Sequence, residues 1–187
     1  MAVVKTYLPA GKVRAEDLLA PDVPEKFIEL IEGELAEMSP AGFWHENIGG
    51  EIELAFRLFA KQHPDVAVGT SNTGFLIKRN PDTLLCPDVC LFRRRPWPRE
   101  QLWGEFAPEL WVEVLSPSNS QAEMTFKRHR LFESGTEQFW LVDPEKREVV
   151  IFHHEGRTTT YTSGETVSCE GIAAGLSIVL EEIFRED

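Results

Sequence analysis

Two acidic residues inside apolar, strand-like runs constrain this chain more than any other feature. Asp88 lies in Cys-Pro-Asp-Val-Cys, and Glu113 lies in Trp-Val-Glu-Val-Leu. A carboxylate in an apolar strand is strongly disfavoured unless it is paired, hydrogen-bonded or bound to a metal. If the two strands pair as an antiparallel hairpin, both carboxylates can converge on one divalent cation, and Mg²⁺ prefers such oxygen ligands. A structural alternative stays open, in which Pro87-Asp88 only begins a strand and Glu113 pairs with an arginine at its rim.

Length and composition favour one domain over residues 1–187. The chain contains twelve Phe and five Trp, enough for a packed core, and it is short for two domains. No run approaches the roughly 20 apolar residues that span a bilayer. The N-terminus lacks the basic start and long apolar run of a signal peptide. We therefore expect a cytoplasmic protein that does not associate with membranes.

The three cysteines, Cys86, Cys90 and Cys169, indicate neither a disulfide framework nor a zinc site. An odd number of cysteines without a secretory signal disfavours disulfides. Cys86 and Cys90 lie in an expected single strand, where a separation of about 13 Å excludes a direct bridge. A closed zinc site takes four ligands, and no second Cys/His pair follows at ligand spacing.

A net charge of −12 excludes a protein that coats nucleic acid through its overall field. Any nucleic-acid contact must therefore be local. Two basic clusters are candidates, namely Arg93-Arg94-Arg95 with Arg99, and Lys127-Arg128-His129-Arg130. For the first cluster, a solvated face or a subunit contact is an equally good interpretation.

The first part of the chain predicts an arm, a hairpin and a helix. Residues 1–26 form the arm, with a short helix near 15–19. Residues 27–38 predict a hairpin that turns at Glu32-Gly33, because glycine supplies the positive φ that such turns need. An apolar stripe at three-and-four spacing predicts a helix over 45–62 that faces a core.

The remaining pattern predicts an α/β fold with a mixed, mostly antiparallel central sheet flanked by helices. Ser120 and Glu123 form a capping box before a helix over 121–134. Strands are expected at 65–68, 74–78, 84–92, 110–115, 137–142, 148–153 and 158–161, followed by a return over 169–180 and an acidic tail.

The segment 93–108 is too long and irregular for a hairpin turn. It contains Trp97 and Trp103, and exposed tryptophans are unfavourable in a monomer but common at interfaces. We therefore expect this segment to contact a partner or a second subunit, and the protein to be a homo-oligomer.

Several segments between about Phe27 and Asp143 resemble one family, in unbroken order. They are Phe-Ile-Glu-Leu-Ile-Glu-Gly-Glu, Met-Ser-Pro with the following His45, Cys-Pro-Asp-Val, Val-Glu-Val-Leu-Ser-Pro-Ser-Asn, Lys127 and Glu-Gln-Phe-Trp-Leu-Val-Asp-Pro. This text is similar to the Uma-type family of restriction-endonuclease-like proteins, within the PD-(D/E)XK nuclease superfamily. The resemblance implies a restriction-endonuclease-like core over 27–143 with an extra N-terminal hairpin, and a C-terminal hairpin and tail over 144–187.

The resemblance also implies metal-dependent hydrolysis of phosphodiester bonds, with DNA as the expected nucleic acid. Mg²⁺ or Mn²⁺ held by Asp88, Glu113 and a backbone carbonyl near Val114 would polarise the phosphate and activate a water. The superfamily places a lysine two residues after the glutamate, where this chain has Leu115. The resemblance transfers that role to Lys127 on the next helix, where it would orient the water or stabilise developing charge.

Lys127 shares a helical face with Met124 and Leu131, so its stem points to the core. It is either a catalytic cation or a lysine that snorkels to water. His45 at the helix start and Glu29 in its apolar strand are supporting candidates for contacting the water or a second ion, or they are hydrogen-bonded structural residues.

Two other functions stay open. A catalytically inactive binding or assembly module with a nuclease fold is favoured by the missing strand lysine, and metal affinity without cleavage would indicate it. A carboxylate-pair hydrolase acting on a sugar is disfavoured, because the aromatic residues form no recognisable sugar platform. Activity without a metal would indicate the hydrolase.

Overall fold

A six-stranded mixed sheet forms the centre of the protein, in the order β10-β9-β8-β7-β6-β3. The computed structural model describes residues 12–20, 28–37 and 42–185. The six strands are β3 (Val66–Thr70), β6 (Val89–Arg93), β7 (Leu110–Val114), β8 (Gln138–Asp143), β9 (Glu148–His153) and β10 (Thr158–Thr162). Strands β7 and β8 run parallel and the other neighbours run antiparallel. This confirms the predicted mixed, mostly antiparallel sheet.

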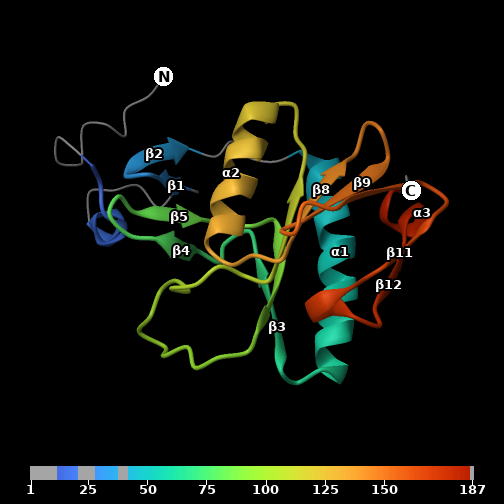
Figure 1. The fold of residues 1–187 in the computed structure, drawn as a ribbon, viewed down its shortest axis with the longest axis horizontal. Helices are drawn as coiled ribbons and strands as arrows, with labels where there is room; N and C mark the ends of the chain where they lie inside the picture. The colour runs from blue at the N-terminus through green and yellow to red at the C-terminus, as the bar shows by residue number, and fades with distance from the viewer. Residues whose placement is uncertain (1–11, 21–27, 38–41, 186–187) are drawn as a thin grey trace.

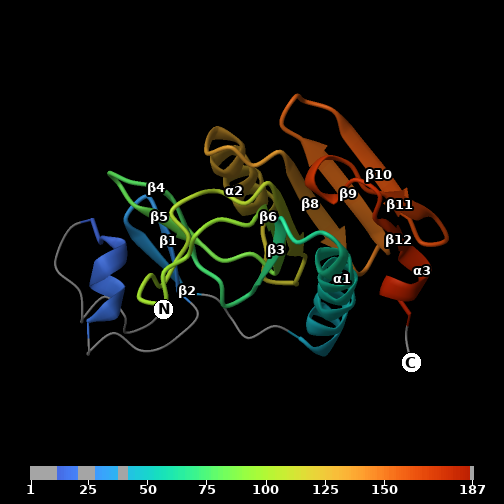
Figure 2. The same cartoon turned by 90° about the horizontal axis from the view of Figure 1, so that it is seen from below.

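Two helices cover the opposite faces of this sheet, α1 (Phe43–Gln62) and α2 (Gln121–Glu133) (Figure 2). The predicted apolar stripe of α1 is buried, at Ile48, Ile52, Phe56 and Phe59. These side chains join a core cluster with alternate residues of β6 and β7, such as Val89 and Val112. The residues between them on each strand face α2, because side chains alternate along a strand.

The predicted N-terminal hairpin is confirmed, and it belongs to a second sheet of order β2-β1-β5-β4. Its strands are β1 (Ile28–Ile31), β2 (Glu34–Glu37), β4 (Phe75–Lys78) and β5 (Thr83–Leu85). At the turn, Glu32 and Gly33 have φ values of 50° and 77°, as a primed hairpin turn requires. Strand β1 pairs with β5 at Leu30 and Leu84. Figure 1 shows this sheet at the end of the molecule remote from α3.

The expected single strand over 84–92 is wrong, because the chain divides there into β5 and β6. The break falls at Cys86, Pro87 and Asp88, between two different sheets. Proline has no N–H to donate to a strand ladder, which explains why pairing stops at this point. Cys86 and Cys90 therefore do not share a strand, although both are free thiols.

The tryptophans between β6 and β7 pack inside their own chain, so the expected exposure of both is wrong. Trp97 lies 6.0 Å from Phe75 between ring centroids and 5.9 Å from Phe106, and its Nε1 donates to the Gln101 carbonyl at 2.8 Å. Trp103 is half-buried and packs against the cluster around Leu30 and Leu84. The two tryptophans therefore no longer support a homo-oligomer, which stays a prediction.

The remaining elements lie at the two ends of the described chain. A 3₁₀ helix covers Ala15–Leu19, as expected, while most of the predicted arm lies outside the described residues. Met38-Ser39-Pro40 also lies outside them. The C-terminal part contains β11 (Thr166–Ser168), a 3₁₀ turn (Gly171–Ala173), β12 (Ser177–Val179) and α3 (Leu180–Ile183). None of the helices in the described ranges is long and apolar enough to cross a membrane.

Candidate active site

The strand register brings Asp88 and Glu113 face to face. In the antiparallel pair β6–β7, Val89 stands opposite Val112. Asp88 directly precedes β6, and continuing this register by one residue would place it opposite Glu113 of β7. Asp88 Oδ2 also accepts a hydrogen bond from the Val114 N–H at 2.7 Å, which fixes its carboxylate across the strand pair.

Lys127 joins two buried carboxylates at this end of the sheet. Its Nζ donates to Glu113 Oε1 at 3.0 Å and to Glu29 Oε1 at 3.1 Å. The side chain is 6% exposed, so the snorkelling alternative is wrong for this residue. The Lys127 side chain therefore points from α2 toward the sheet, on the buried helix face that it shares with Met124 and Leu131.

Glu113 and Glu29 each accept a second hydrogen bond besides that from Lys127. Trp111 Nε1 donates to Glu113 Oε1 at 2.6 Å from two residues earlier on the same strand face. The Cys86 N–H donates to Glu29 Oε1 at 3.0 Å. The sequence analysis missed both donors. The spacing of Trp111 and Glu113 along one strand was the available signal for the first of them.

His45 reaches the same site from the first turn of α1. Its Nε2 lies 3.3 Å from Asp88 Oδ2, and its Nδ1 is buried without a hydrogen bond to the described chain. The hydrogen bond to Asp88 raises the pKa of His45, against the opposing effect of burial. The five sequence candidates thus form two contact groups, Lys127 with Glu29 and Glu113, and His45 with Asp88, and Asp88 accepts the N–H of Val114 next to Glu113.

Burial and charge shift the pKa values in the cluster. Burial, with the charges of Asp88 and Glu29, raises the pKa of Glu113 to about 7 despite the opposing effect of Lys127. Burial acts to lower the pKa of Lys127, but Glu113 and Glu29 hold it above its usual value. The lysine therefore stays charged at neutral pH, while the carboxylates repel one another.

The donor chemistry of this cluster fits a hard divalent cation. Two carboxylates contact the Lys127 ammonium and a third, Asp88, contacts His45, so full ionisation with a neutral histidine leaves two negative charges. Hydrogen bonds occupy Asp88 Oδ2 and Glu113 Oε1, and within the described chain none reaches Asp88 Oδ1 or Glu113 Oε2. Carboxylate oxygens are the ligands that Mg²⁺ prefers. Among the described residues, no group of three or more His, Cys, Asp or Glu side chains is placed so that it could hold a metal ion by itself.

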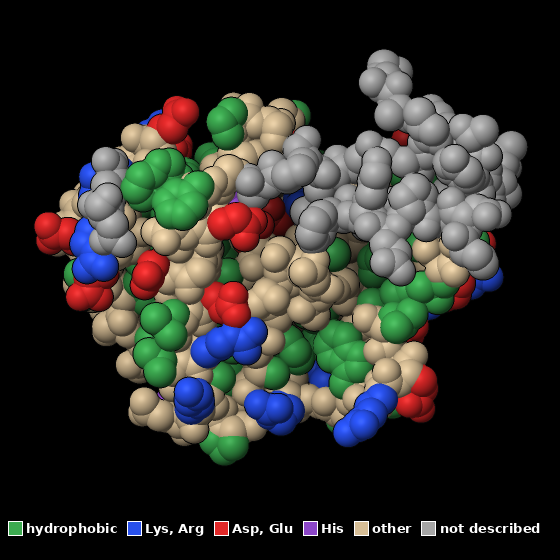
Figure 3. Space-filling view, turned by 180° about the vertical axis from the view of Figure 1, so that it is seen from behind, with side chains coloured by type: hydrophobic (Ala, Val, Ile, Leu, Met, Phe, Trp, Pro, Cys, Tyr) green, Lys and Arg blue, Asp and Glu red, His purple; other side chains and the backbone are tan. Residues whose placement is uncertain are grey.

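The first basic cluster lies away from this site. Arg93 ends β6 while Asp88 precedes its start, a separation of roughly 16 Å along the strand. Arg94 donates to the carbonyls of Pro64 and Val66, and Arg95 pairs with Glu109. Figure 3 shows Lys and Arg side chains gathered along the lower edge, which in Figure 1 holds the C-terminal end of α1. These arginines therefore support the loop after β6.

The second basic cluster is also engaged within the chain. Lys127 is buried in the site, and the Arg128 guanidinium lies 4.0 Å from the centroid of the Phe152 ring. Arg130 pairs with Glu32 and Glu133. These basic residues therefore contact different parts of the protein, and of the three only Lys127 contacts the carboxylates of Glu29 and Glu113.

A mixed sheet between two helices, with one acid just before β6 and another on β7, is the arrangement of a restriction-endonuclease-like nuclease fold. The chain belongs to the Uma2 family, whose description is "Putative restriction endonuclease" and whose match covers residues 15–181. Among solved structures, it is similar to one from Anabaena variabilis, described as "a putative nuclease belonging to DUF820". The TM-score is 0.77 at 21% identity, over 92% of this chain and 97% of that chain. Among curated proteins, none matches this chain.

Proposed function

We propose that this protein is a metal-dependent nuclease that hydrolyses phosphodiester bonds of nucleic acid, with DNA as the expected substrate. The observation that carries the proposal is the buried Lys127, which bridges Glu113 and Glu29 beside Asp88. A buried cation shared between acids is an expensive arrangement, and packing alone gives no reason to keep it. Membership of the Uma2 family supports the same function.

In this proposal Asp88, Glu113 and a backbone carbonyl near Val114 would hold Mg²⁺ or Mn²⁺. The metal, when bound, supplies Lewis acidity and lowers the pKa of a bound water. Lys127 stabilises negative charge that develops on the phosphate oxygens. Glu29 positions the lysine, because its carboxylate accepts a second hydrogen bond from Nζ besides that to Glu113.

His45 acts through Asp88 in the same proposal. Its Nε2 contact and the Val114 N–H both restrain Asp88 Oδ2, so that the other carboxylate oxygen would remain available to a metal ion. Ligand carboxylates that are held by such outer contacts bind metal more tightly. A direct contact of His45 with the attacking water is the alternative role for this residue.

Cleavage of plasmid, single-stranded DNA and RNA with Mg²⁺, Mn²⁺ or EDTA tests the proposal. Asp88→Asn should abolish metal binding and cleavage together. Lys127→Met should retain metal binding and lower cleavage by about two to three orders of magnitude, the scale of a lost electrostatic stabiliser. Calorimetric titration with the metal separates the two phenotypes.

Lys61→Met is the matched control, since Lys61 is exposed on α1 and makes no contact with the site. It should cleave like the wild type. Lys127→Met combined with Glu29→Gln keeps the charge balance of the cluster and provides a second variant if the single one unfolds. Equal cleavage by the wild type and a folded Lys127→Met variant would show that Lys127 is a structural residue.

A catalytically inactive binding or assembly module is the second candidate. The observation in its favour is Leu115, which stands where the superfamily places a strand lysine. Metal binding by the wild type without cleavage of any of the three substrates would select this candidate. Light scattering tests the separate prediction of a homo-oligomer, and a monomer would contradict it.

A further inference from the structure

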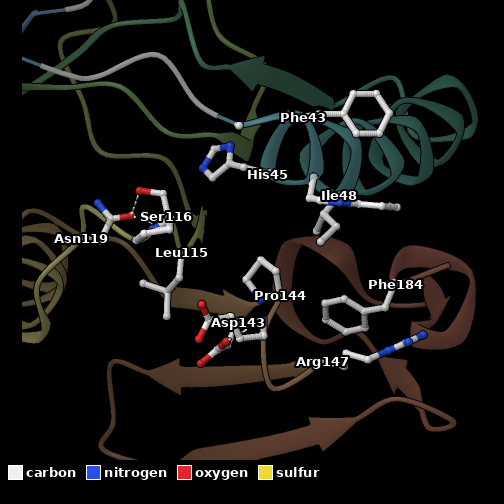
Figure 4. Close-up of a pocket in the computed structure, with 14 residues that line it drawn as sticks. Phe43, His45, Ile48, Leu115, Ser116, Asn119, Asp143, Pro144, Arg147 and Phe184 are labelled. Carbon is white, nitrogen blue, oxygen red and sulfur yellow. Dashed lines mark hydrogen bonds between the residues drawn. The ribbon is translucent and has the colours of Figure 1, made fainter. Parts of the chain in front are cut away.

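A pocket of about 530 Å³ adjoins the candidate active site. Figure 4 shows it between the start of α1, the turn after β7 and the turn after β8. Its polar end contains His45, Ser116 and Asn119, and its apolar end contains Ile48, Pro144 and Phe184. His45 belongs to both places, because its Nε2 lies 3.3 Å from Asp88 Oδ2. A ligand in the pocket therefore lies next to the carboxylates.

An exposed aromatic pair borders this pocket. Phe43 is 75% exposed and Trp44 is 45% exposed, and their rings form an edge-to-face pair with centroids 5.5 Å apart. Two exposed aromatic side chains beside a pocket present flat apolar surfaces to a ligand. Nucleobases stack on such surfaces whatever their sequence, because every base has a π-face.

The polar end of the pocket has a fixed hydrogen-bond donor. Asn119 Oδ1 accepts from the Ser116 N–H at 2.8 Å and from its hydroxyl at 2.9 Å. The backbone N–H can only donate, so this contact assigns the amide oxygen to the Ser116 side. The Asn119 Nδ2 group is thereby left to donate to a ligand, since no hydrogen bond within the described chain uses it.

The pocket walls carry carboxylate groups that can accept hydrogen bonds from a ligand. The walls include the carboxylates of Asp143 and Glu145, together with Arg147 and His45. Asp143 is paired with Lys146 and accepts from the N–H groups of the turn, whereas no ion pair or hydrogen bond of the Glu145 side chain is found within residues 12–20, 28–37 and 42–185. Carboxylates accept hydrogen bonds from the exocyclic amino groups of bases, such as N4 of cytosine. A base therefore matches the pocket better than a phosphate does.

We propose that this pocket binds an unpaired nucleobase of the nucleic-acid strand whose phosphate lies at the carboxylate cluster. Phe43 and Trp44 stack on bases at the mouth, and Asn119 and Glu145 face the polar edge of the bound base. The inference rests on the proposed function for its substrate, and it narrows that substrate to single-stranded or locally unpaired nucleic acid. A paired base must first leave its stack, which costs free energy and weakens binding of a duplex.

The test measures binding by fluorescence anisotropy, with EDTA present so that no strand is cut. The probes are fluorescein-labelled oligodeoxycytidylate, the same length of oligocytidylate RNA, an abasic DNA strand of equal length, and a DNA duplex. Both base-bearing single strands should bind about tenfold or more tightly than the abasic strand, the scale of one or two stacked bases. The DNA and RNA arms identify which strand the protein prefers.

Phe43→Ala and Trp44→Ala should each weaken binding of the base-bearing strands about tenfold and leave the abasic strand unchanged. Leu54→Ala is the matched control, because Leu54 is an exposed apolar residue of α1 that does not line the pocket. Thermal unfolding checks that each variant folds. Equal affinity for the abasic and base-bearing strands, or unchanged binding by both aromatic variants, would overturn the inference.

The binding assay is independent of cleavage. Base-dependent binding that Phe43→Ala and Trp44→Ala weaken supports the pocket even if the wild type cleaves nothing with Mg²⁺, a result that would contradict the proposed nuclease activity alone. Cleavage with equal binding of abasic and base-bearing strands would contradict the pocket and leave the nuclease proposal intact. The two proposals therefore fail in distinguishable ways.

Discussion

Asp82 and Glu113 are buried to a similar extent, at 4% and 7% exposure, but their pKa values shift in opposite directions. Burial acts to raise the pKa of Asp82, but the N–H groups of Ala15 and Asn80 and the Arg79 guanidinium together hold it below its usual value. The pKa of Glu113 is raised, because burial acts there together with the nearby charges of Asp88 and Glu29.

The difference lies in the partners that each acid receives. Asp82 Oδ2 accepts from the Ala15 N–H at 3.0 Å and from Arg79 at 3.1 Å, and its other oxygen accepts from the Asn80 N–H at 3.3 Å. Glu113 shares its cation with Glu29 and faces Asp88 across the strand pair. A buried carboxylate whose oxygens all accept hydrogen bonds stabilises the contact between the segments that donate them. Several buried carboxylates around one lysine instead leave excess negative charge, which favours binding of a further cation.

The largest expected effect on stability is at the shared cation. Lys127→Met should lower the free energy of unfolding by about 3–5 kcal/mol at neutral pH, because it leaves Glu29 and Glu113 buried without their partner. Urea unfolding followed by circular dichroism measures the change. Adding Glu29→Gln and Glu113→Gln should recover most of the loss, and a triple variant as unstable as the single one would contradict this account.

Asp82→Asn should have the next largest effect. The substitution places an amide NH₂ among three donors, so we expect a loss of about 1–3 kcal/mol in the free energy of unfolding. Asp65→Asn is the control, because Asp65 is exposed and its side chain makes no hydrogen bond or ion pair within the described part of the chain. If the two substitutions changed the urea midpoint equally, the donors around Asp82 would not be what distinguishes it.

Glu113→Gln should change stability less than Asp82→Asn, although both replace a buried carboxyl by an amide. Glutamine keeps the volume and an acceptor for Trp111 Nε1, and Lys127 keeps its bond to Glu29. We expect a change within about 1 kcal/mol, since removing one of several crowded acids relieves repulsion. The same urea experiment gives the comparison. A loss larger than that of Asp82→Asn would show that Glu113 is mainly a structural residue.

The smallest expected effect is the change with pH in the stability that Asp82 contributes. The folded pKa of Asp82 lies below its ordinary value of 3.8, so its stabilisation is complete above that pH. It is lost as the pH falls through the lower folded pKa, where the folded and unfolded carboxyls are both protonated. The difference in unfolding free energy between the wild type and Asp82→Asn should therefore narrow below pH 3.8. A constant difference between neutral pH and pH 3 would contradict the hydrogen-bonded carboxylate.

The sequence predicted the elements that depend on neighbouring residues. The apolar stripe of α1, the Glu32-Gly33 turn and the capping box of Ser120 and Glu123 all agree with the structure. Each of these signals lies within a few residues, because helix faces, turns and caps are set by local geometry. Asp88 and Glu113 could also be identified as candidate site residues from the sequence, since an acid within an apolar run is a local pattern.

The tertiary structure decided which distant residues meet. Glu29 and Lys127 are 98 positions apart in the sequence, and β1 and α2 bring them within 3.1 Å of each other. Tertiary packing also placed Trp97 in an aromatic cluster, where the sequence had favoured an interface. No local pattern specifies such contacts, because they depend on how the two sheets and the helices pack together. The sequence by itself determined the helices, the turns and the candidate acids. The packing of β1, β7 and α2 determined that Glu29 and Glu113 share Lys127.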